Sequence, residues 1–503
     1  MSQHSHIPEK ILAEIWKEQR FASELFDETG EKIEVQYVGD ENLDKGGPDF
    51  INARIKVGNL TFVGDVEIDN TRSDWRNHGH YLNRRFNKVI LHAIVSNESN
   101  QKFVYTQNGR RINTFCFAPH VQEEVLESLK KAMAMEDDSK TNKLHCYKVI
   151  DFANEKEVLN FVSKLGISRF KKKCDKLIIR IRELLFIDSL QVKEPAEQYA
   201  IPEDVYTEKL CYDDLNKKHI WEQLFYELIF EALGYPNNKD AFNKITRAVT
   251  ISQLQSLTIP ADKFVEVVES IFFSISGMIP DVDSIKNPDI LAYVRIVTEN
   301  MMKYYPLYDG ERLDAVDWHF FRLRPLNFPT IRLAAGARLV EKITRGDLIG
   351  HIMTKFYEIH DFVVLKKLAR GLLIVKSDGH WKKHYTFEKP AKQESIHFFL
   401  GTNRADEMFV NVVLPFAYVY FDLFGKPKFA NKVLSVYRDV ACEVENALVT
   451  EAANALHIET DRKKSVIYQG ILELFSSFCS KNRCEECSIG KIVFSDADEP
   501  RLN

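Results

Sequence analysis

The segment Lys88–Val95 (KVILHAIV) is a continuous apolar run without the polar alternation of a strand that has one face in water. Such runs are typical of strands buried on both faces of a sheet, so other elements must cover both sides of this one. Three more strands are predicted upstream, at Lys32–Val38, Asp49–Val57 and Leu60–Ile68, from their apolar and β-branched residues. Gly58–Asn59 is a hairpin signal, so the last two should be antiparallel neighbours.

Helical spacing of apolar residues is found on either side of these strands. Pro8–Phe26 is predicted to be an amphipathic helix, and Ser73–Phe86 a second helix with Ser73 as its N-cap. Edge strands are expected at Phe103–Tyr105 and Phe115–Phe117, and from about Val121 onward helical periodicity dominates. The expected fold class is therefore α+β, with an N-terminal αβββαβ module followed by a large, mainly α-helical region.

A chain of 503 residues exceeds one ordinary core, so two or three domains are expected. Polar stretches suggest an α/β module over residues 1–135, a linker with a basic helix over 136–206, and a mainly helical domain over 207–503. The start of the chain has no basic segment followed by an apolar one, and no apolar run approaches the roughly 20 residues that span a bilayer. We therefore expect a cytoplasmic protein without membrane contact.

Carboxylates gather around the predicted hairpin. Asp49 enters the second strand, Glu67 lies near the end of the third, and Asp69 shares the face of Glu67 because side chains alternate along a strand. Oxygen ligands of this kind hold Mg²⁺, which polarises a phosphate and activates water. We predict Asp49 and Glu67 as ligands of Mg²⁺, with Asp69 beside them. The other interpretation is a hairpin with exposed acids and no function.

The segment after the hairpin supplies further polar side chains. Asp74 and His78 are one turn apart on the predicted helix, where they could assist the acids or, for Asp74, cap the helix. His92 lies in the buried strand and is interpreted as a core histidine with satisfied hydrogen bonds. The predicted catalytic residues are Asp49, Glu67, Asp69, Asp74 and His78.

Longer motifs are spread over nearly the whole chain: GGPDFINARI (Gly46–Ile55), GDVEI and SDWRNHGH (within Gly64–His80), RPLNFPTIRLA (Arg324–Ala334) and CSKNRCEECSIG (Cys479–Gly490). Together they resemble a bacterial family recorded only as a domain of unknown function. The N-terminal part resembles the PD-(D/E)XK nuclease superfamily. That resemblance implies a restriction-endonuclease-like module and a Mg-dependent phosphodiesterase.

One position departs from the nuclease pattern. Where that pattern has Lys, this chain has Asp69, and Lys56 or Arg72 is expected to supply the missing cation. The prediction is a metal-dependent, nuclease-like protein that processes nucleic acid, either active or catalytically degenerate. The alternative is a non-enzymatic scaffold that binds nucleic acid or a protein partner.

A net charge of −5 gives no overall attraction to nucleic acid, so such affinity requires a local cluster of Lys and Arg. Between Lys164 and Arg182 eight basic residues stand against a single acid, with apolar residues at roughly helical spacing. A basic amphipathic helix suits contact with a phosphate backbone, although charge runs also occur on plain solvated faces. The predicted contacts are Lys164, Arg169, Lys171, Lys172, Lys173, Lys176 and Arg180.

The C-terminal motif Cys479-x4-Cys484-x2-Cys487 is the most specific local pattern. Thiolates at this spacing hold Zn²⁺ or an iron–sulfur cluster, because Cys-x2-Cys lets two sulfurs reach one metal. A fourth ligand would come from elsewhere in the chain, from Cys442, Cys174 or a histidine such as His457. The alternative is a set of reduced thiols without metal.

Overall fold

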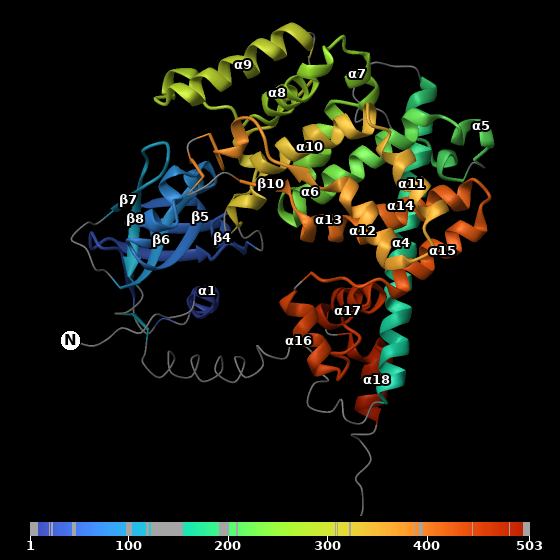
Figure 1. The fold of residues 1–503 in the computed structure, drawn as a ribbon. Helices are drawn as coiled ribbons and strands as arrows, with labels where there is room; N and C mark the ends of the chain where they lie inside the picture. Colours follow the sequence, from blue (N-terminus) through green and yellow to red (C-terminus); the bar gives the residue numbers. More distant parts are fainter. Residues whose placement is uncertain are drawn as a thin grey trace, which may run out of the picture. The chain divides into compact units, whose positions relative to one another are not determined.

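The computed structural model describes residues 9–19, 21, 24–42, 47–96, 103–116, 120–121, 154–190, 201–207, 210–306, 308, 310–320, 323–387, 389–391, 396–444, 446–481 and 483–495. The chain divides into two compact units, Met1–Thr141 and Asn142–Asn503. The first is built on a mixed sheet and the second is mainly helical, which confirms the α+β class (Figure 1). Pro8, Phe117 and the predicted linker residues 136–153 and 191–200 lie outside the described residues.

The sheet of the first unit contains every strand predicted from the sequence. In spatial order its strands are β1 (Leu25–Phe26), β2 (Lys32–Tyr37), β4 (Phe50–Val57), β5 (Leu60–Thr71), β6 (Val89–Ser96), β8 (Arg111–Cys116) and β7 (Phe103–Tyr105), and β3 (Asp40–Glu41) also pairs with β4. β2, β4 and β5 form an antiparallel meander, and β5 and β4 meet at the predicted hairpin. β6 is parallel to β5 and to β8, so β8 lies inside the sheet and is not the predicted edge strand.

The crossover between β5 and β6 is not the single helix predicted over Ser73–Phe86. It consists of a short helix α2 (Asp74–Asn77) followed by two 3-10 turns, His80–Leu82 and Arg84–Lys88. Gly79 adopts a left-handed conformation with φ of 78°, which ends the helix before the apolar spacing can extend it. The interruption changes the direction of the chain, so His80 lies in a 3-10 turn and does not continue the helix.

The C-terminal half of β5, Asp65–Asn70, is buried on both faces, and one face is apolar whereas the other is acidic. Val66 and Ile68 pack with Leu12 and Trp16 of α1 (Glu9–Glu18), which ends well before the predicted Phe26. The alternate side chains Asp65, Glu67 and Asp69 belong to the opposite face of the strand. Around Trp75 and Phe86 of the crossover, a second apolar cluster forms. A row of buried carboxylates therefore occupies a position that an ordinary core would fill with apolar side chains.

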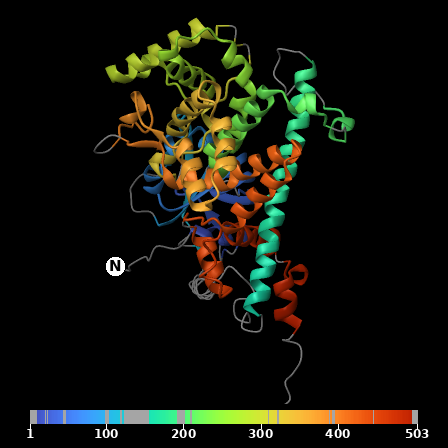
Figure 2. The same cartoon turned by 45° about the vertical axis from the view of Figure 1, so that its right-hand side comes forward.

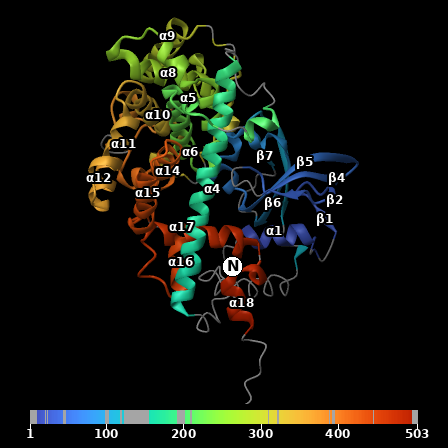
Figure 3. The ribbon, with the colours of Figure 1, turned by 90° about the vertical axis from the view of Figure 1, so that its right-hand side faces the viewer.

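The second unit is organised by one long helix, α4 (Glu155–Leu190), which Figure 2 shows along its whole length. α17 crosses α4 where Gly166 and Gly470 let the two backbones approach (Figure 3). None of the described helices combines the length and the apolar composition that a bilayer crossing needs. The remaining elements are α5 (Tyr212–Leu215), α6 (Lys218–Ala248), α7 (Ile251–Ser256), α8 (Phe264–Ser276), α9 (Pro288–Tyr304), α10 (Pro329–Thr344), α11 (Leu348–Glu358), α12 (Phe362–Leu373), β9 (Val375–Lys376), β10 (Phe398–Leu400), α13 (Thr402–Met408), the π-helical segment η12 (Phe409–Val413), α14 (Leu414–Leu423), α15 (Pro427–Asp439), α16 (Ala447–Ala455), α17 (Ser465–Ser477) and α18 (Ser488–Ser495).

Candidate metal centre

The buried acidic face of β5 is the starting point of the site. Asp65 and Glu67 are each 6% exposed and Asp69 is 1% exposed. Burial of a carboxylate is costly unless hydrogen bonds or counter-charges compensate it. The side chains and backbone groups around these three carboxylates must therefore compensate the cost of burying them.

Asp49 and Glu67 are held together by the backbone of the hairpin. The N–H of Asp49 donates to Oε2 of Glu67 at 3.2 Å, and the N–H of Ile68 donates to Oδ2 of Asp49 at 2.8 Å. The pairing of Phe50 with Val66 sets this register. The two acids that the sequence assigns to one metal therefore lie side by side across β4 and β5.

Asp69 is hydrogen-bonded to two histidines from different elements. Its Oδ1 lies 3.0 Å from Nδ1 of His78, and its Oδ2 lies 3.0 Å from Nε2 of His92 on β6. Burial raises the pKa of Asp69, but the hydrogen bonds from His78 and His92 outweigh it and hold that pKa well below its usual range. Asp69 is therefore ionised at neutral pH although it is enclosed.

His80 is a candidate metal ligand that the sequence analysis did not include. Its Nε2 lies 3.0 Å from Oε1 of Glu67 and 3.8 Å from Oδ2 of Asp69, and its ring stacks on Phe86 with 4.0 Å between centroids. Burial lowers the pKa of His80 to about 4, although Asp69 acts in the opposite direction, so the imidazole is neutral at pH 7. Within the described part of the chain, Nε2 of His80 is buried and has no hydrogen-bond partner. A neutral imidazole nitrogen in this state is suited to binding a metal.

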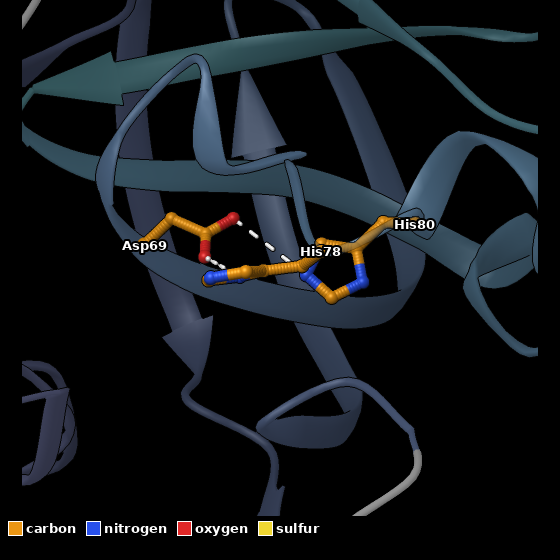
Figure 4. Close-up of side chains that lie close together, drawn as sticks. All are labelled: Asp69, His78 and His80. Atoms are coloured by element: carbon orange, nitrogen blue, oxygen red, sulfur yellow. Dashed lines mark hydrogen bonds and ion pairs between the residues drawn. The ribbon is translucent and has the colours of Figure 1, made fainter. Parts of the chain in front are cut away.

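The ligand atoms of Asp69, His78 and His80 all lie within 4.8 Å of one another, and Figure 4 shows both imidazoles close to the carboxylate. Among the described residues this group could hold a metal ion. One carboxylate with two imidazoles suits Zn²⁺, Mn²⁺ or Fe²⁺ better than an all-oxygen set does. The spacing His78-x-His80 was a signal in the sequence, but a helical interpretation of this segment puts the two rings on different faces.

Asp74, predicted as catalytic, is part of the turn that follows β5. Its Oδ2 accepts hydrogen bonds from the N–H and the hydroxyl of Thr71, both at 2.9 Å. Trp75 donates from Nε1 to the carbonyl of Tyr105 at 3.0 Å and so fastens the crossover to β7. These contacts fix the segment of the chain that connects Asp69 to His78 and His80.

The lysine that the nuclease pattern requires is not replaced by either cation that the sequence suggested. Lys56 pairs with Glu34 at 3.7 Å, at the opposite end of β4 from Asp49. Arg72 is buried and pairs with Glu28. Both cations are engaged by other acids, and the groups that approach the carboxylates are imidazoles.

The basic residues of α4 divide into two sets. Arg169 and Lys172 both pair with Glu473 of α17, and Arg180 pairs with Glu227 of α6. Lys173 donates to Asn411 of η12. These four residues connect α4 to neighbouring helices, and of the four Lys172 is itself exposed. The other exposed members of the predicted set are Lys164, Lys171 and Lys176.

Cys479, Cys484 and Cys487 line one small cavity near the C-terminal end of the described chain. The other cysteines considered as ligands lie elsewhere: Sγ of Cys174 faces the carbonyl of Pro415 at 4.0 Å, and Cys442 lines a different pocket. The motif is therefore brought together in space without either of those two cysteines.

A protein-family model described as "Protein of unknown function (DUF2851)" matches residues 9–185 and 208–446, more than half of the chain. The match confirms the resemblance to a family of unknown function, and the terminal motif Cys479–Gly490 lies outside the matched residues. No curated protein and no solved structure matches the chain.

Proposed function

The chain belongs to the DUF2851 family, and from that premise we propose that it is a metal-dependent phosphodiesterase acting on nucleic acid. The observation that carries the proposal is the convergence of the buried side chains Glu67, Asp69 and His80 with the more exposed His78 beside β5. Burying these polar side chains costs free energy, yet the sequence has no apolar side chains at these positions. Catalysis is the most direct explanation for such a cluster.

The position of the cluster in the topology supports a nuclease rather than another hydrolase. Asp49 precedes the second strand of an antiparallel meander, and Glu67 and Asp69 end the third, before a crossover to the parallel strand β6. The PD-(D/E)XK resemblance implies metal-binding acids at the positions of Asp49 and Glu67, and a lysine at the position of Asp69. Imidazoles of His78 and His80 then take the place of the lysine.

The proposed roles follow from protonation and contact. Asp69, His78 and His80 would hold the metal, and Glu67, whose Oε1 lies 3.0 Å from Nε2 of His80, would be a further ligand. A bound metal ion would activate water and stabilise charge on a phosphate. Asp49, anchored through Oδ2 to the backbone of Ile68, receives the proton. The mixed oxygen and nitrogen donors favour Mn²⁺ or Zn²⁺ over the Mg²⁺ expected from the acids alone.

The crossover that supplies the histidines also carries cations. Arg76, Arg84 and Lys88 are exposed, and the ring of Tyr81 is 40% exposed. Phosphate contacts from Arg and Lys position a nucleic acid, and an exposed aromatic ring allows base stacking. A substrate bound along this segment would present a phosphate to the cluster.

The experiment is cleavage of labelled single- and double-stranded DNA and RNA by the purified full chain, with Mg²⁺, Mn²⁺ or Zn²⁺ and with EDTA. We expect cleavage with Mn²⁺ or Zn²⁺ that EDTA abolishes. The double substitution Asp49→Ala/Glu67→Ala should reduce the rate by a factor on the order of 100 or more. Glu34→Gln is the matched control, because it removes a carboxylate on the same sheet whose surface pair with Lys56 contributes little.

A second candidate, binding without cleavage, rests on Asp69 standing where the pattern has Lys. In that case the chain would shift nucleic acid on a gel and cleave none of the four substrates with any metal. A chain that neither cleaves nor binds nucleic acid would contradict both candidates and favour the protein-interaction scaffold.

A further inference from the structure

We infer that Cys479, Cys484 and Cys487 bind a single soft metal ion, Zn²⁺ in the first instance, at a site separate from the Asp–His cluster. Cys479 and Cys484 each begin a 3-10 turn, Cys479–Lys481 and Cys484–Glu486, and Cys487 lies between the second turn and α18 (Ser488–Ser495). They line one cavity together with Leu474, Phe478 and Ile489. Among the residues that line it, only the cysteines have side chains that bind metal.

The backbone around Cys487 is shaped to hold a sulfur ligand. The N–H of Cys487 donates to the carbonyl of Cys484 at 3.1 Å, which closes the Cys-x2-Cys segment into a tight turn. Burial disfavours a thiolate at Cys487, and hydrogen bonds from the backbone N–H groups of Gly490 and Ile489 to its sulfur partly offset that cost. A bound metal cation would supply the remaining stabilisation of the thiolate.

Gly490 makes this turn sterically possible. A Cβ at residue 490 would lie 2.2 Å from the carbonyl oxygen of Cys484, so no other residue fits without moving the backbone. The close approach brings Cys484 against the first turn of α18 and keeps Cys484 and Cys487 on the same cavity. The requirement for glycine at residue 490 is an observation that does not depend on the spacing of the cysteines.

The small size of the cavity favours one ion over a cluster. Its volume is about 20 Å³, close to the space that a single water molecule occupies. An iron–sulfur cluster needs several times that space, whereas one Zn²⁺ with Zn–S bonds of about 2.3 Å needs only that the sulfurs turn inward. The three sulfurs are not all within 4.8 Å of one another, so binding requires side-chain rotation.

A metal at this position would join the end of α17 to α18. Cys479 follows α17 (Ser465–Ser477), whose Gly470 packs against α4, and Cys487 directly precedes α18. The site would thus fasten the C-terminal segment to the helix that organises the second unit. Its role is structural, and its presence does not depend on the proposed catalysis.

The test is the metal content of the untagged full chain, purified without chelators from cells grown with zinc, by inductively coupled plasma mass spectrometry. We expect Cys484→Ser and Cys487→Ser each to lose about one equivalent of zinc, and Cys211→Ser, at an exposed cysteine outside the cavity, to lose none. His80→Phe should leave this equivalent in place, so failure of the catalytic centre and failure of this site give different results.

Cobalt substitution adds a spectroscopic signature. The wild-type chain loaded with Co²⁺ should show thiolate-to-cobalt charge-transfer absorption, and Cys484→Ser should not. Zinc retained by both cysteine variants, a wild-type chain that takes up neither Zn²⁺ nor Co²⁺ under reducing conditions, or iron with inorganic sulfide in the purified protein would each overturn the inference.

A measurement on the unmutated chain covers the case in which a variant fails to fold. Cys479 and Cys484 are half-buried, and Cys211 is exposed. Zinc should protect Cys479 and Cys484 from alkylation, and chelation should remove that protection without changing the rate at Cys211. Equal alkylation of Cys479 and Cys484 with and without zinc would contradict the site.

Discussion

Nε2 of His80 lies 3.0 Å from Oε1 of Glu67, and this close pair does not have the geometry of a hydrogen bond. Two ligands that bind one ion at about 2.1 Å and at a right angle to each other are about 3.0 Å apart. The pair is therefore spaced as neighbouring ligands would be. A buried nitrogen without a hydrogen bond otherwise costs folding free energy.

This cost leads to two predictions for His80→Phe. Without metal the variant should be at least as stable as the wild type, and added metal should no longer stabilise it. His80→Phe keeps a ring against Phe86 and removes the buried polar atom, so the metal-free variant should melt at the same temperature as the wild type or higher. The wild type should gain about 2.7 kcal/mol at a Mn²⁺ concentration 100 times Kd, and the variant should gain nothing. Differential scanning fluorimetry with Mn²⁺ and with EDTA measures both effects, and Mn²⁺ is used because Zn²⁺ would also bind the cysteine site. An unchanged metal-induced shift in His80→Phe would exclude His80 as a ligand.

Lys173 gives a prediction about pH. Burial, with a contribution from Arg169, lowers the pKa of Lys173 to about 7, whereas an unfolded lysine has a pKa of about 10.4. Between these values the unfolded chain holds a proton that the folded chain does not, so this group's contribution to stability rises as the pH increases. The melting temperature of the wild type should therefore increase from pH 7 to pH 9 relative to that of Lys173→Met. Parallel pH profiles of the two proteins would show that Lys173 stays charged in the folded chain.

The crossing of α4 and α17 predicts a contrast between two glycines. A Cβ at Gly470 would lie 2.0 Å from the carbonyl oxygen of Val162, so Gly470→Ala should separate the helices and destabilise the chain by roughly 1–3 kcal/mol. Gly371 is also helical, but a Cβ there meets nothing within 4 Å, so Gly371→Ala should be neutral or stabilising by up to about 1 kcal/mol. Urea unfolding followed by circular dichroism compares the two. Equal effects would mean that the crossing is not tightly packed.

The exposed lysines of α4 are a test of phosphate contact. If α4 binds a nucleic-acid backbone, Lys171→Glu should weaken binding of all sequences alike and reduce the slope of log Kd against log salt concentration by about 1. Lys367→Glu on α12 is the control, because it changes the net charge equally at another exposed lysine. Fluorescence anisotropy with labelled single-stranded DNA at several salt concentrations gives the slopes. The same loss in both variants would show a general charge effect and no contact by α4.

Local sequence patterns predicted the framework of the first unit. Strand alternation and the Gly58–Asn59 turn gave β4 and β5, and a period of two residues put Glu67 and Asp69 on one face. The register of that hairpin then brought Asp49 to Glu67. These features depend on residues close together in the chain, so local spacing is sufficient to predict them.

Only the tertiary structure decided which groups complete the cluster and which basic residues are engaged in packing. Gly79 breaks the helix that apolar spacing favours, and the returning chain brings His80 to Glu67. Arg169 of α4 meets Glu473 of α17, a partner that no local pattern could identify. The physical reason is that an apolar period records which face of a segment is buried, but not which distant segment covers it. The sequence by itself therefore determined the strands and the acidic face, and the packing of distant segments determined the ligands and ion pairs.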